Sequence, residues 1–303
     1  MKNSLIKYCK TIGITKVGIA DIGPYKELEK KLKEREEKGW LTGLEESDIQ
    51  KRIDPKLTME NVKSIIVCLF PYHTKEIKRA NLSNYTYSKD YHFIVKDKLD
   101  NIGEFLSSRT ENFQYKSFVD TGPLVDRYLA YKAGLGFFGI NAHLINDDYG
   151  TYSFIGYILV NKHIEPDKPL DKTCYQCMKC VYSCPGNVIM GDFDINPLKC
   201  RSYITQKKRD LDKRDIEILK KDNVIFGCDI CQEVCPHNDG IKTTNIKEFR
   251  EDLIHRLDYN EIKRMSNRGF KREYGNRAFA WRGRKILKRN HEIIHNIKDE
   301  DFN

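Results

Sequence analysis

The sequence predicts a mixed fold of helices and strands, of the α+β or α/β class, followed by a cysteine-rich domain and a basic helical segment. Three observations support this prediction. Short apolar runs alternate with segments of helical period up to about residue 165. Eight of the 10 cysteines lie between Cys174 and Cys235. Between residues 263 and 289 there are 11 basic residues and one acidic residue.

The composition fits a protein that folds around its own core in the cytoplasm. The chain has 303 residues, of which 40% are hydrophobic, so it can bury a large core without disulfide bonds. No run approaches the about 18 apolar residues of a membrane span. Met1 leads into an amphipathic segment, not into the apolar stretch of a signal peptide. We therefore expect a cytoplasmic protein with no membrane partner. The net charge of +9 is modest for this length.

The first half alternates between expected helices and expected strands. Residues 65–70 form a continuous apolar run that ends at Pro71, as in a buried strand. Residues 90–108 have apolar positions three and four apart, as in an amphipathic helix. In chain order, we expect an N-terminal helix, a strand at 17–20, a helix at 25–39, a strand at 65–70, a helix at 90–108, a strand at 117–120, a helix at 124–133 and a strand at 152–160.

A stretch with two prolines at residues 165–169 is the clearest linker in the chain. It separates the mixed first domain from cysteine-rich sequence that continues to about residue 240. The remaining residues are polar, basic and helical in pattern. We therefore expect three parts, with boundaries at 1–165, 166–240 and 241–303.

Two cysteine runs carry the strongest chemical signal. The first, Cys174-x2-Cys177-x2-Cys180-x3-Cys184-Pro185, has the spacing of a bacterial ferredoxin, and the second ends in Cys235-Pro236. In two-cluster ferredoxins, the fourth cysteine of a run binds the other cluster. This exchange predicts two [4Fe-4S] clusters, the first held by Cys174, Cys177, Cys180 and Cys235 and the second by Cys184, Cys200, Cys228 and Cys231.

Structural zinc is the alternative interpretation of these cysteines. A four-cysteine zinc site needs two pairs of cysteines. It does not explain a third cysteine after a two-residue gap, or the proline after each final cysteine. The spacing therefore favours iron–sulfur clusters. Cys9 and Cys68 stand alone and are expected to be ordinary buried residues.

Two further features precede the linker. Gly134-x-Gly136-x-x-Gly139 fits a dinucleotide-binding pattern, but a helix is expected before it where that motif requires a strand. We expect these glycines to end a helix and to let the backbone pass close to another group. Asp120 ends an expected strand. It is either a turn or cap residue, or a general acid whose pKa is raised by burial beside an apolar cofactor.

Several segments resemble the epoxyqueuosine reductase family. They are Lys51-Arg52-x-x-Pro55-Lys56-Leu57, Lys89-Asp90-Tyr91-His92, Val119-Asp120-Thr121-Gly122-Pro123-Leu124-Val125-Asp126-Arg127, Ala133-Gly134-Leu135-Gly136-Phe137-Phe138-Gly139 and Gly227-Cys228-Asp229-Ile230-Cys231-Gln232-x-Val234-Cys235-Pro236. The resemblance runs from about residue 5 to residue 292. Longer members carry a C-terminal helical-repeat extension, and this chain resembles the short form without it. It has Ile140 where many relatives have lysine.

The resemblance implies a reaction and a set of site residues. The family reduces epoxyqueuosine to queuosine at the wobble position of tRNA with cobalamin and two [4Fe-4S] clusters. Its cobalamin-binding domain is akin to that of reductive dehalogenases. By this resemblance the clusters reduce cobalamin, the cobalt supplies electrons to the epoxide, and an uncharged Asp120 protonates the departing oxygen. The implied cobalamin contacts are Arg52, Ser83, Asp120, Leu144, Ile155, Ser202, Cys228 and Asp229.

The basic C-terminal part suits a tRNA partner. Cations without neighbouring acids can neutralise phosphates, and aromatic rings can stack on unpaired bases, although a solvated helix face would have the same pattern. Trp281 is expected to pack into the core with Phe279, Ile286 and Leu287. We expect tRNA contacts from Lys207, Asn267, Arg268, Arg284 and Lys285, with Lys208 and Arg209 beside the first.

Two other functions fit parts of the sequence. A cobalamin-dependent reductive dehalogenase would share the cofactors, but such enzymes usually carry an export signal and lack a basic tail. A non-enzymatic electron carrier would leave the large N-terminal domain unexplained. We therefore expect an oxidoreductase that acts on tRNA as a monomer and takes electrons from an unidentified reductant.

Overall fold

The computed structural model describes residues 1–74, 80–208 and 210–297. Arg209, which we grouped with the tRNA-contacting cations, lies outside these ranges. A four-stranded sheet forms the centre of the N-terminal half, and every neighbouring pair of strands is antiparallel, so the fold is α+β. All four expected strands are present. Their spatial order is β1 (Lys16–Ala20), β2 (Ser64–Pro71), β6 (Ser153–Val160) and β3 (Tyr115–Val119).

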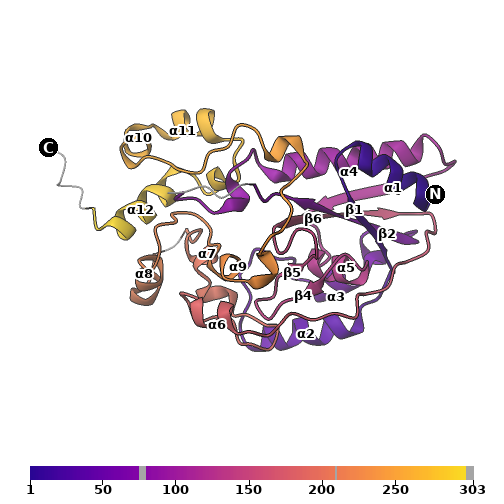
Figure 1. Ribbon diagram of the computed structural model, residues 1–303, viewed down its shortest axis with the longest axis horizontal. Helices are drawn as coiled ribbons and strands as arrows, with labels where there is room; N and C mark the ends of the chain where they lie inside the picture. Colours follow the sequence, from indigo (N-terminus) through magenta and orange to yellow (C-terminus); the bar gives the residue numbers. More distant parts are fainter. Residues whose placement is uncertain (75–79, 209, 298–303) are drawn as a thin grey trace.

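Helices cover both faces of this sheet (Figure 1). One face packs against α1 (Lys2–Thr11) and α4 (Tyr91–Ser107), and the other against α2 (Lys26–Glu37) and α5 (Asp126–Lys132). β2 is buried along its whole length. Because successive side chains of a strand point to opposite faces, β2 contributes to both cores. The first core contains Ile66, Cys68 and Phe70, and the second contains Ile65, Val67 and Leu69.

The glycine motif ends α5 and opens a tight hairpin. Gly134 has a left-handed backbone with φ of +67°, and a Cβ placed there would lie 2.5 Å from the Lys168 carbonyl oxygen. A Cβ on Gly136 would lie 2.5 Å from the Ile145 carbonyl oxygen. The motif leads into strand β4 (Phe137–Phe138), which pairs with β5 (Leu144–Ile145), instead of opening a helix. The expectation of a helix end with close backbone approach is therefore confirmed.

The linker lies along the edge of the sheet. The Asp167 N–H donates to the Ile19 carbonyl oxygen at 2.8 Å, and the Ile19 N–H donates to Asp167 Oδ2 at 2.9 Å. These bonds attach the start of the cysteine-rich part to β1. That part contains the short helices α6 (Lys179–Ser183), α7 (Arg201–Ile204), α8 (Lys213–Leu219) and α9 (Ile230–Glu233).

The C-terminal part packs against both other parts. Leu82 and Tyr87 share a core with Phe226 and Phe279, and Phe249 joins the first core of the sheet. The expected boundary at residue 240 therefore divides the sequence but does not separate the cores. The C-terminal helices are α10 (Tyr259–Arg264), α11 (Asn267–Tyr274) and α12 (Arg284–His295).

Short helical segments complete the described structure. Within the described ranges, no helix is both long and apolar enough to cross a lipid bilayer. A five-residue α-helix, α3, spans Ile49–Ile53. Single 3-10 turns occur at Pro55–Leu57, Asn84–Thr86, Pro197–Lys199, Pro236–Asn238, Lys247–Phe249 and Ala278–Ala280.

Candidate active site

The eight clustered cysteines line two cavities, four cysteines in each. With their open mouths included, the smaller cavity has a volume of about 310 Å³ and the larger one about 1140 Å³. This grouping coincides with the ligand sets that the exchange between the two runs gives. Cys174, Cys177, Cys180 and Cys235 line the smaller cavity, and Cys184, Cys200, Cys228 and Cys231 line the larger one.

The thiols around the two cavities are available as metal ligands. All ten cysteines are free of disulfide bonds. Four thiols line each cavity, the number of cysteine ligands that a [4Fe-4S] cluster requires. Burial raises the pKa of Cys228 to about 12, so this thiol must release its proton when it binds metal.

The two remaining cysteines lie away from the cavities. Cys9 and Cys68 are both fully buried in the first core of the sheet. Their expected role as ordinary core residues is confirmed.

The larger cavity lies between the sheet and the cysteine-rich part. Tyr72, Tyr91 and Phe154 line it from the sheet side, and Ser202 and the second set of cysteines line it from the other. Without its open mouth, this cavity has a volume of about 360 Å³, within the roughly 300–1000 Å³ of common small-molecule pockets. The aromatic and apolar side chains on its walls fit a largely apolar cofactor beside the second cluster.

Asn141 lines both cavities, although no motif in the sequence marks it as a site residue. It follows the glycine motif, and its Nδ2 donates to the Cys231 carbonyl oxygen at 3.3 Å. A Cβ on Gly139 would lie 2.6 Å from Asn141 Oδ1, so the motif's last glycine makes room for this side chain. The neighbouring Ile140 is buried and lines the smaller cavity.

Asp120 lies at the end of β3 within a network of hydrogen bonds. Its backbone is left-handed, with φ of +55°, and its N–H donates to Asp126 Oδ2 at 3.1 Å. The Tyr91 hydroxyl donates to Asp120 Oδ2 at 2.8 Å, and His92 Nε2 lies 3.1 Å from the same oxygen. His92 Nδ1 lies 2.7 Å from Asp90 Oδ1. Tyr91 also lines the larger cavity, so this network reaches the cavity wall.

The hydrogen bonds around Asp120 favour its charged form. Its side chain is 58% exposed. Partial desolvation by the surrounding groups would raise its pKa, but hydrogen bonds from His92 and Tyr91 outweigh desolvation and lower the pKa below its ordinary value. Burial likewise opposes the charging of His92, yet hydrogen bonds to Asp120 and Asp90 raise its pKa to about 9. Both shifts favour a charged Asp120 and a protonated His92. An uncharged Asp120 beside a bulky apolar cofactor stays a prediction.

Four of the eight implied cobalamin contacts line one of two spaces. Ser202 and Cys228 line the larger cavity. Arg52 and Asp120 line an adjoining hollow of about 630 Å³, together with Arg127. Both places are connected through Tyr91, which contacts Asp120 and lines the cavity.

The other four positions line neither of these two spaces. Ser83 is fully buried, and its hydroxyl donates to Asp229, whose other carboxyl oxygen accepts the Asn84 N–H at 2.7 Å. Leu144 is buried in the second core, and Ile155 packs against that core from β6. Direct contact of these four residues with a cofactor stays a prediction.

The expected tRNA-contacting residues gather where α11 and α12 begin. Arg284 Nε donates to Asn267 Oδ1 at 3.3 Å, which holds the two helix starts together. Arg284 Nη1 also donates to the Ile262 carbonyl oxygen at 2.9 Å, so much of its hydrogen-bonding capacity is used within the protein. Arg268 and Lys285 are exposed. Lys207 lies against α12 farther along, where its carbonyl oxygen accepts from Arg289 Nη1 at 2.8 Å, and its ammonium pairs with Asp215 at 2.7 Å.

Trp281 is on the surface, so its expected burial is wrong. Its side chain is 51% exposed, whereas Phe279 and Leu287 are fully buried. The indole Nε1 donates to Gln206 Oε1 at 2.9 Å, and the Arg282 guanidinium lies 3.7 Å from the ring centroid. A polar bond and a stacked cation keep the ring at the surface while Phe279 occupies the inward position.

Comparisons with known proteins agree with this geometry. The family model described as epoxyqueuosine reductase QueG, DUF1730 matches residues 52–121, which include Asp120. The model of a 4Fe-4S double cluster binding domain matches residues 173–238. The epoxyqueuosine reductase of Staphylococcus aureus is 38% identical over 299 residues, which cover 96% of this chain and 78% of that protein. The chain belongs to the epoxyqueuosine reductase family.

Other epoxyqueuosine reductases extend the similarity to whole structures. The Bacillus subtilis protein is 35% identical and is matched over 96% of this chain and 77% of its own length. The structure from Streptococcus thermophilus superposes with a TM-score of 0.88 at 36% identity, covering 97% of this chain and 80% of that one. A crystal structure of epoxyqueuosine reductase with an epoxyqueuosine-modified tRNA-Tyr stem loop has a TM-score of 0.90 at 33% identity, with the same coverage.

Proposed function

We propose that the protein is an oxidoreductase that reduces epoxyqueuosine to queuosine at the wobble position of tRNA, a reaction of the cytoplasm. The observation that carries the proposal is the larger cavity. Four cysteines line one wall, the sheet lines the other, and Tyr91 links it to Asp120. Electron supply and a proton source thus meet at one cavity with aromatic and apolar walls. The similarity to epoxyqueuosine reductases over nearly the whole chain supports the same reaction.

Two [4Fe-4S] clusters and cobalamin are the cofactors that this proposal requires. When bound, cobalamin would supply a reduced cobalt centre that can give electrons to the epoxide. Tyr72, Phe154 and Ser202 are placed to hold it in the larger cavity, next to the second set of cysteines. This wall of aromatic side chains would also exclude water from the reacting groups.

The exposure of the cysteines indicates the order in which electrons would pass between the cofactors. Cys177 is exposed, whereas Cys174 and Cys180 beside it are buried. An external reductant therefore reaches the first cluster most readily. Cys228 and Cys231, which line the larger cavity, would hold the second cluster between the first cluster and the cofactor.

Asp120 and His92 would supply the proton to the oxygen that leaves the epoxide. His92 carries it at neutral pH, and the pKa of Asp120 is lowered by the same hydrogen bond. A bulky apolar group beside Asp120 would exclude water and raise the pKa of its carboxyl, because desolvation disfavours the charged form. The proton can then pass over the 3.1 Å from His92 Nε2 to Asp120 Oδ2, and from there to the oxygen that leaves the epoxide.

Anaerobically purified protein, reconstituted with iron, sulfide and cobalamin, would test the function. With dithionite and an epoxyqueuosine-containing stem loop, we expect queuosine, detected by mass spectrometry. Asp120→Asn should retain clusters and cobalamin but lose turnover by about 10²–10⁴-fold, the usual contribution of a general acid. Asp97→Asn, a change on the exposed surface of α4, is the control. Fully loaded wild-type protein that makes no queuosine would overturn the function. Wild-type rates in Asp120→Asn would remove Asp120 as the acid.

A further inference from the structure

Arg201 is a fully buried cation among the cysteines of the larger cavity. Its side chain is 0% exposed, it directly follows Cys200, and it lines the cavity together with Cys228. Both cysteines belong to the ligand set of the second cluster. Burying a cation costs free energy unless hydrogen bonds or opposite charges compensate the lost hydration. The groups around the Arg201 guanidinium therefore indicate its role.

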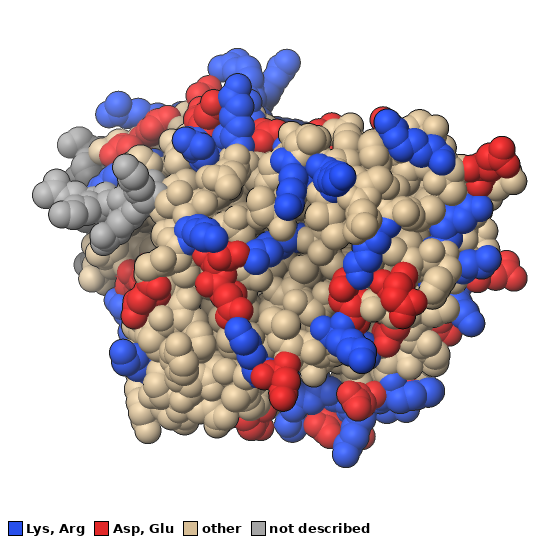
Figure 2. All heavy atoms as spheres, turned by 45° about the vertical axis from the view of Figure 1, so that its right-hand side comes forward, with Lys and Arg blue, Asp and Glu red and all other residues tan. Residues whose placement is uncertain are grey.

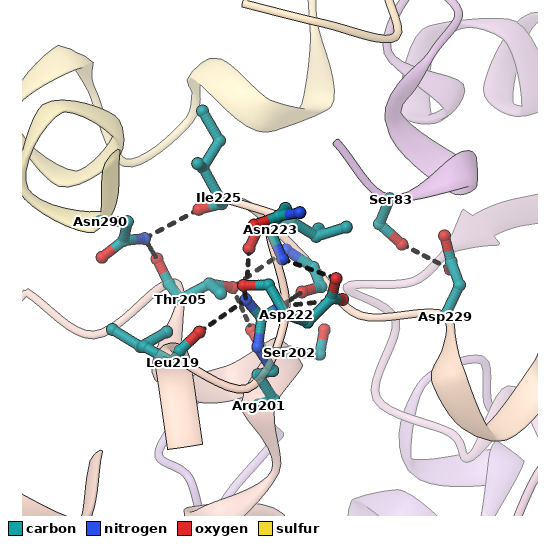
Figure 3. Close-up of polar contacts among 12 residues, drawn as sticks. Ser83, Arg201, Ser202, Thr205, Leu219, Asp222, Asn223, Ile225, Asp229 and Asn290 are labelled. Atoms are coloured by element: carbon teal, nitrogen blue, oxygen red, sulfur yellow. Dashed lines mark hydrogen bonds and ion pairs between the residues drawn. The ribbon is translucent and has the colours of Figure 1, made fainter. Parts of the chain in front are cut away.

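The guanidinium holds the loop that leads to Cys228, as Figure 3 shows. Nη2 donates to the carbonyl oxygens of Leu219 at 3.0 Å, Asp222 at 2.7 Å and Val224 at 2.7 Å. Nη1 donates to the Gly227 carbonyl oxygen at 3.4 Å. Arg201 therefore bonds to the backbone at four points between α8 and Cys228. This fork of donors cannot be reproduced by the single ammonium of a lysine.

The positive charge of Arg201 is only partly balanced by protein groups. One carboxylate approaches it: Asp222 Oδ2 lies 3.7 Å from Nη1, and this side chain is 27% exposed. Arg201 Nε is buried without a hydrogen-bond partner among the described residues. The side chains of Cys228 and Cys200 also interact electrostatically with the guanidinium. The cation thus faces the thiols that would become negatively charged ligands.

A cation in this position changes the energy of adding an electron. The reduction potential of an iron–sulfur cluster depends on net charge, on hydrogen bonds to its sulfurs and on solvent exposure. Reduction makes the cluster more negative by one charge, and a buried positive charge stabilises that state more strongly than an exposed one. Arg201 has this charge, lies beside two ligands, and is shielded from water.

We propose that Arg201 is a positioning residue that raises the electron affinity of the second cluster by holding a buried guanidinium against Cys200 and Cys228. In the step concerned, the first cluster loses one electron and the second gains it, and no bond forms or breaks and no proton moves. The electron originates from a one-electron reductant, which is dithionite in the test. The inference rests on the ligand sets used in the proposed function.

Redox titration of the cluster-loaded protein, followed by electron paramagnetic resonance, tests the proposal. In Arg201→Gln we expect the equilibrium constant for reduction of one cluster to fall at least ten-fold, which is about 59 mV for a one-electron couple. The other cluster should keep its potential. Arg201→Lys should give a smaller change, because it keeps the charge but loses most of the donors.

Two further variants separate charge from folding. Asp222→Asn removes the compensating carboxylate but keeps the carbonyl bond, so it should shift the same cluster in the opposite direction. Arg277→Gln is the matched control, since Arg277 is also buried, with a side chain 4% exposed, and donates to the Tyr87 and Asp252 carbonyl oxygens. It lies in the C-terminal part and lines neither cysteine cavity. We expect both potentials to be unchanged in it.

The outcomes distinguish this inference from the proposed function. Unchanged potentials in an Arg201→Gln protein that holds both clusters would overturn the inference and leave the function intact. If Arg201→Gln loses its clusters, the absence of an upward shift in Asp222→Asn would overturn it instead. Wild-type protein without iron–sulfur clusters would overturn the ligand sets themselves, and the inference with them.

Discussion

His92 Nε2 lies 3.1 Å from Asp120 Oδ2, and the opposite ring nitrogen lies 2.7 Å from Asp90 Oδ1. A histidine between two carboxylates keeps its proton to a higher pH, and its charge in turn keeps Asp120 ionised. The two groups therefore act as one unit in which the proton rests on the ring and is within reach of the carboxylate. This relationship has consequences for both stability and turnover.

The pair should stabilise the fold within a defined pH range. The pKa of His92 is raised to about 9 from an ordinary value of 6.5, so its contribution is complete below pH 6.5 and is lost as the pH rises through about 9. The pKa of Asp120 is lowered from an ordinary value of 3.8, so its contribution is lost as the pH falls below that value. We expect the difference in Tm between wild type and His92→Gln to be largest between about pH 5 and 6.5 and to vanish above about pH 9. A difference independent of pH would contradict the pairing.

Turnover should depend on the proton that His92 carries. In His92→Gln we expect kcat to fall about ten- to a hundred-fold, within the range of acid–base contributions, while the affinity for the stem loop stays the same. The alkaline limb of the pH–rate profile should also move to lower pH. His163→Gln is the control, because that histidine is 68% exposed and pairs with Glu165 on the surface. A normal rate with an unchanged pH profile would show that His92 takes no part in proton supply.

Removing one exposed cysteine should remove one cluster. Cys177→Ala leaves three thiols around the smaller cavity and all four around the larger one. We therefore expect about half of the wild-type iron content and loss of one of the two cluster signals. Cys68→Ala, a change at a fully buried core cysteine, should keep all the iron while it lowers the free energy of unfolding. Full iron content in Cys177→Ala would contradict the ligand set.

Charge reversal at the start of α11 and α12 should weaken tRNA binding. Arg268 and Lys285 are exposed, whereas Arg284 is engaged with the protein backbone, so the first two are the better test. In Arg268→Glu with Lys285→Glu we expect weaker stem-loop binding and a flatter salt dependence, by about 0.9 in log–log slope for each lost phosphate contact.

The control for this test is an equal change of charge on another surface. Figure 2 shows acidic and basic side chains intermixed on the face it presents, so the overall charge of +9 is not gathered there into a single patch. Lys7→Glu with Lys30→Glu alters two exposed lysines of α1 and α2. Equal loss of affinity in both double variants would mean that net charge, not this surface, governs binding.

Trp281 offers a flat surface for a base. Because the ring is 51% exposed and held by Gln206, we expect Trp281→Ala to weaken stem-loop binding by about 1–3 kcal/mol, the usual contribution of base stacking. Trp40→Ala is a matched control, since Trp40 is also partly exposed and has a cation, Lys38, 4.6 Å from its ring centroid. Unchanged affinity in Trp281→Ala would exclude stacking at this residue.

The sequence by itself determined the elements and the distribution of metal ligands. Residues 65–70 are apolar at every position and end at a proline, as expected of a strand covered on both faces, and β2 is such a strand. The cysteine spacings likewise predict which four of the eight thiols line each cavity. These features are local, because periodicity and spacing are set by residues close together in the chain.

Tertiary structure decided the properties that depend on distant neighbours. The charge of Asp120 is set by His92, 28 residues away, and the exposure of Trp281 by its bond to Gln206, 75 residues away. Nothing in the sequence distinguishes Arg201 from the other basic residues. It becomes a buried cation only when the loop before Cys228 folds around it. Protonation and burial are decided by desolvation and by the partner groups that folding brings near, and neither is encoded in a short stretch of sequence.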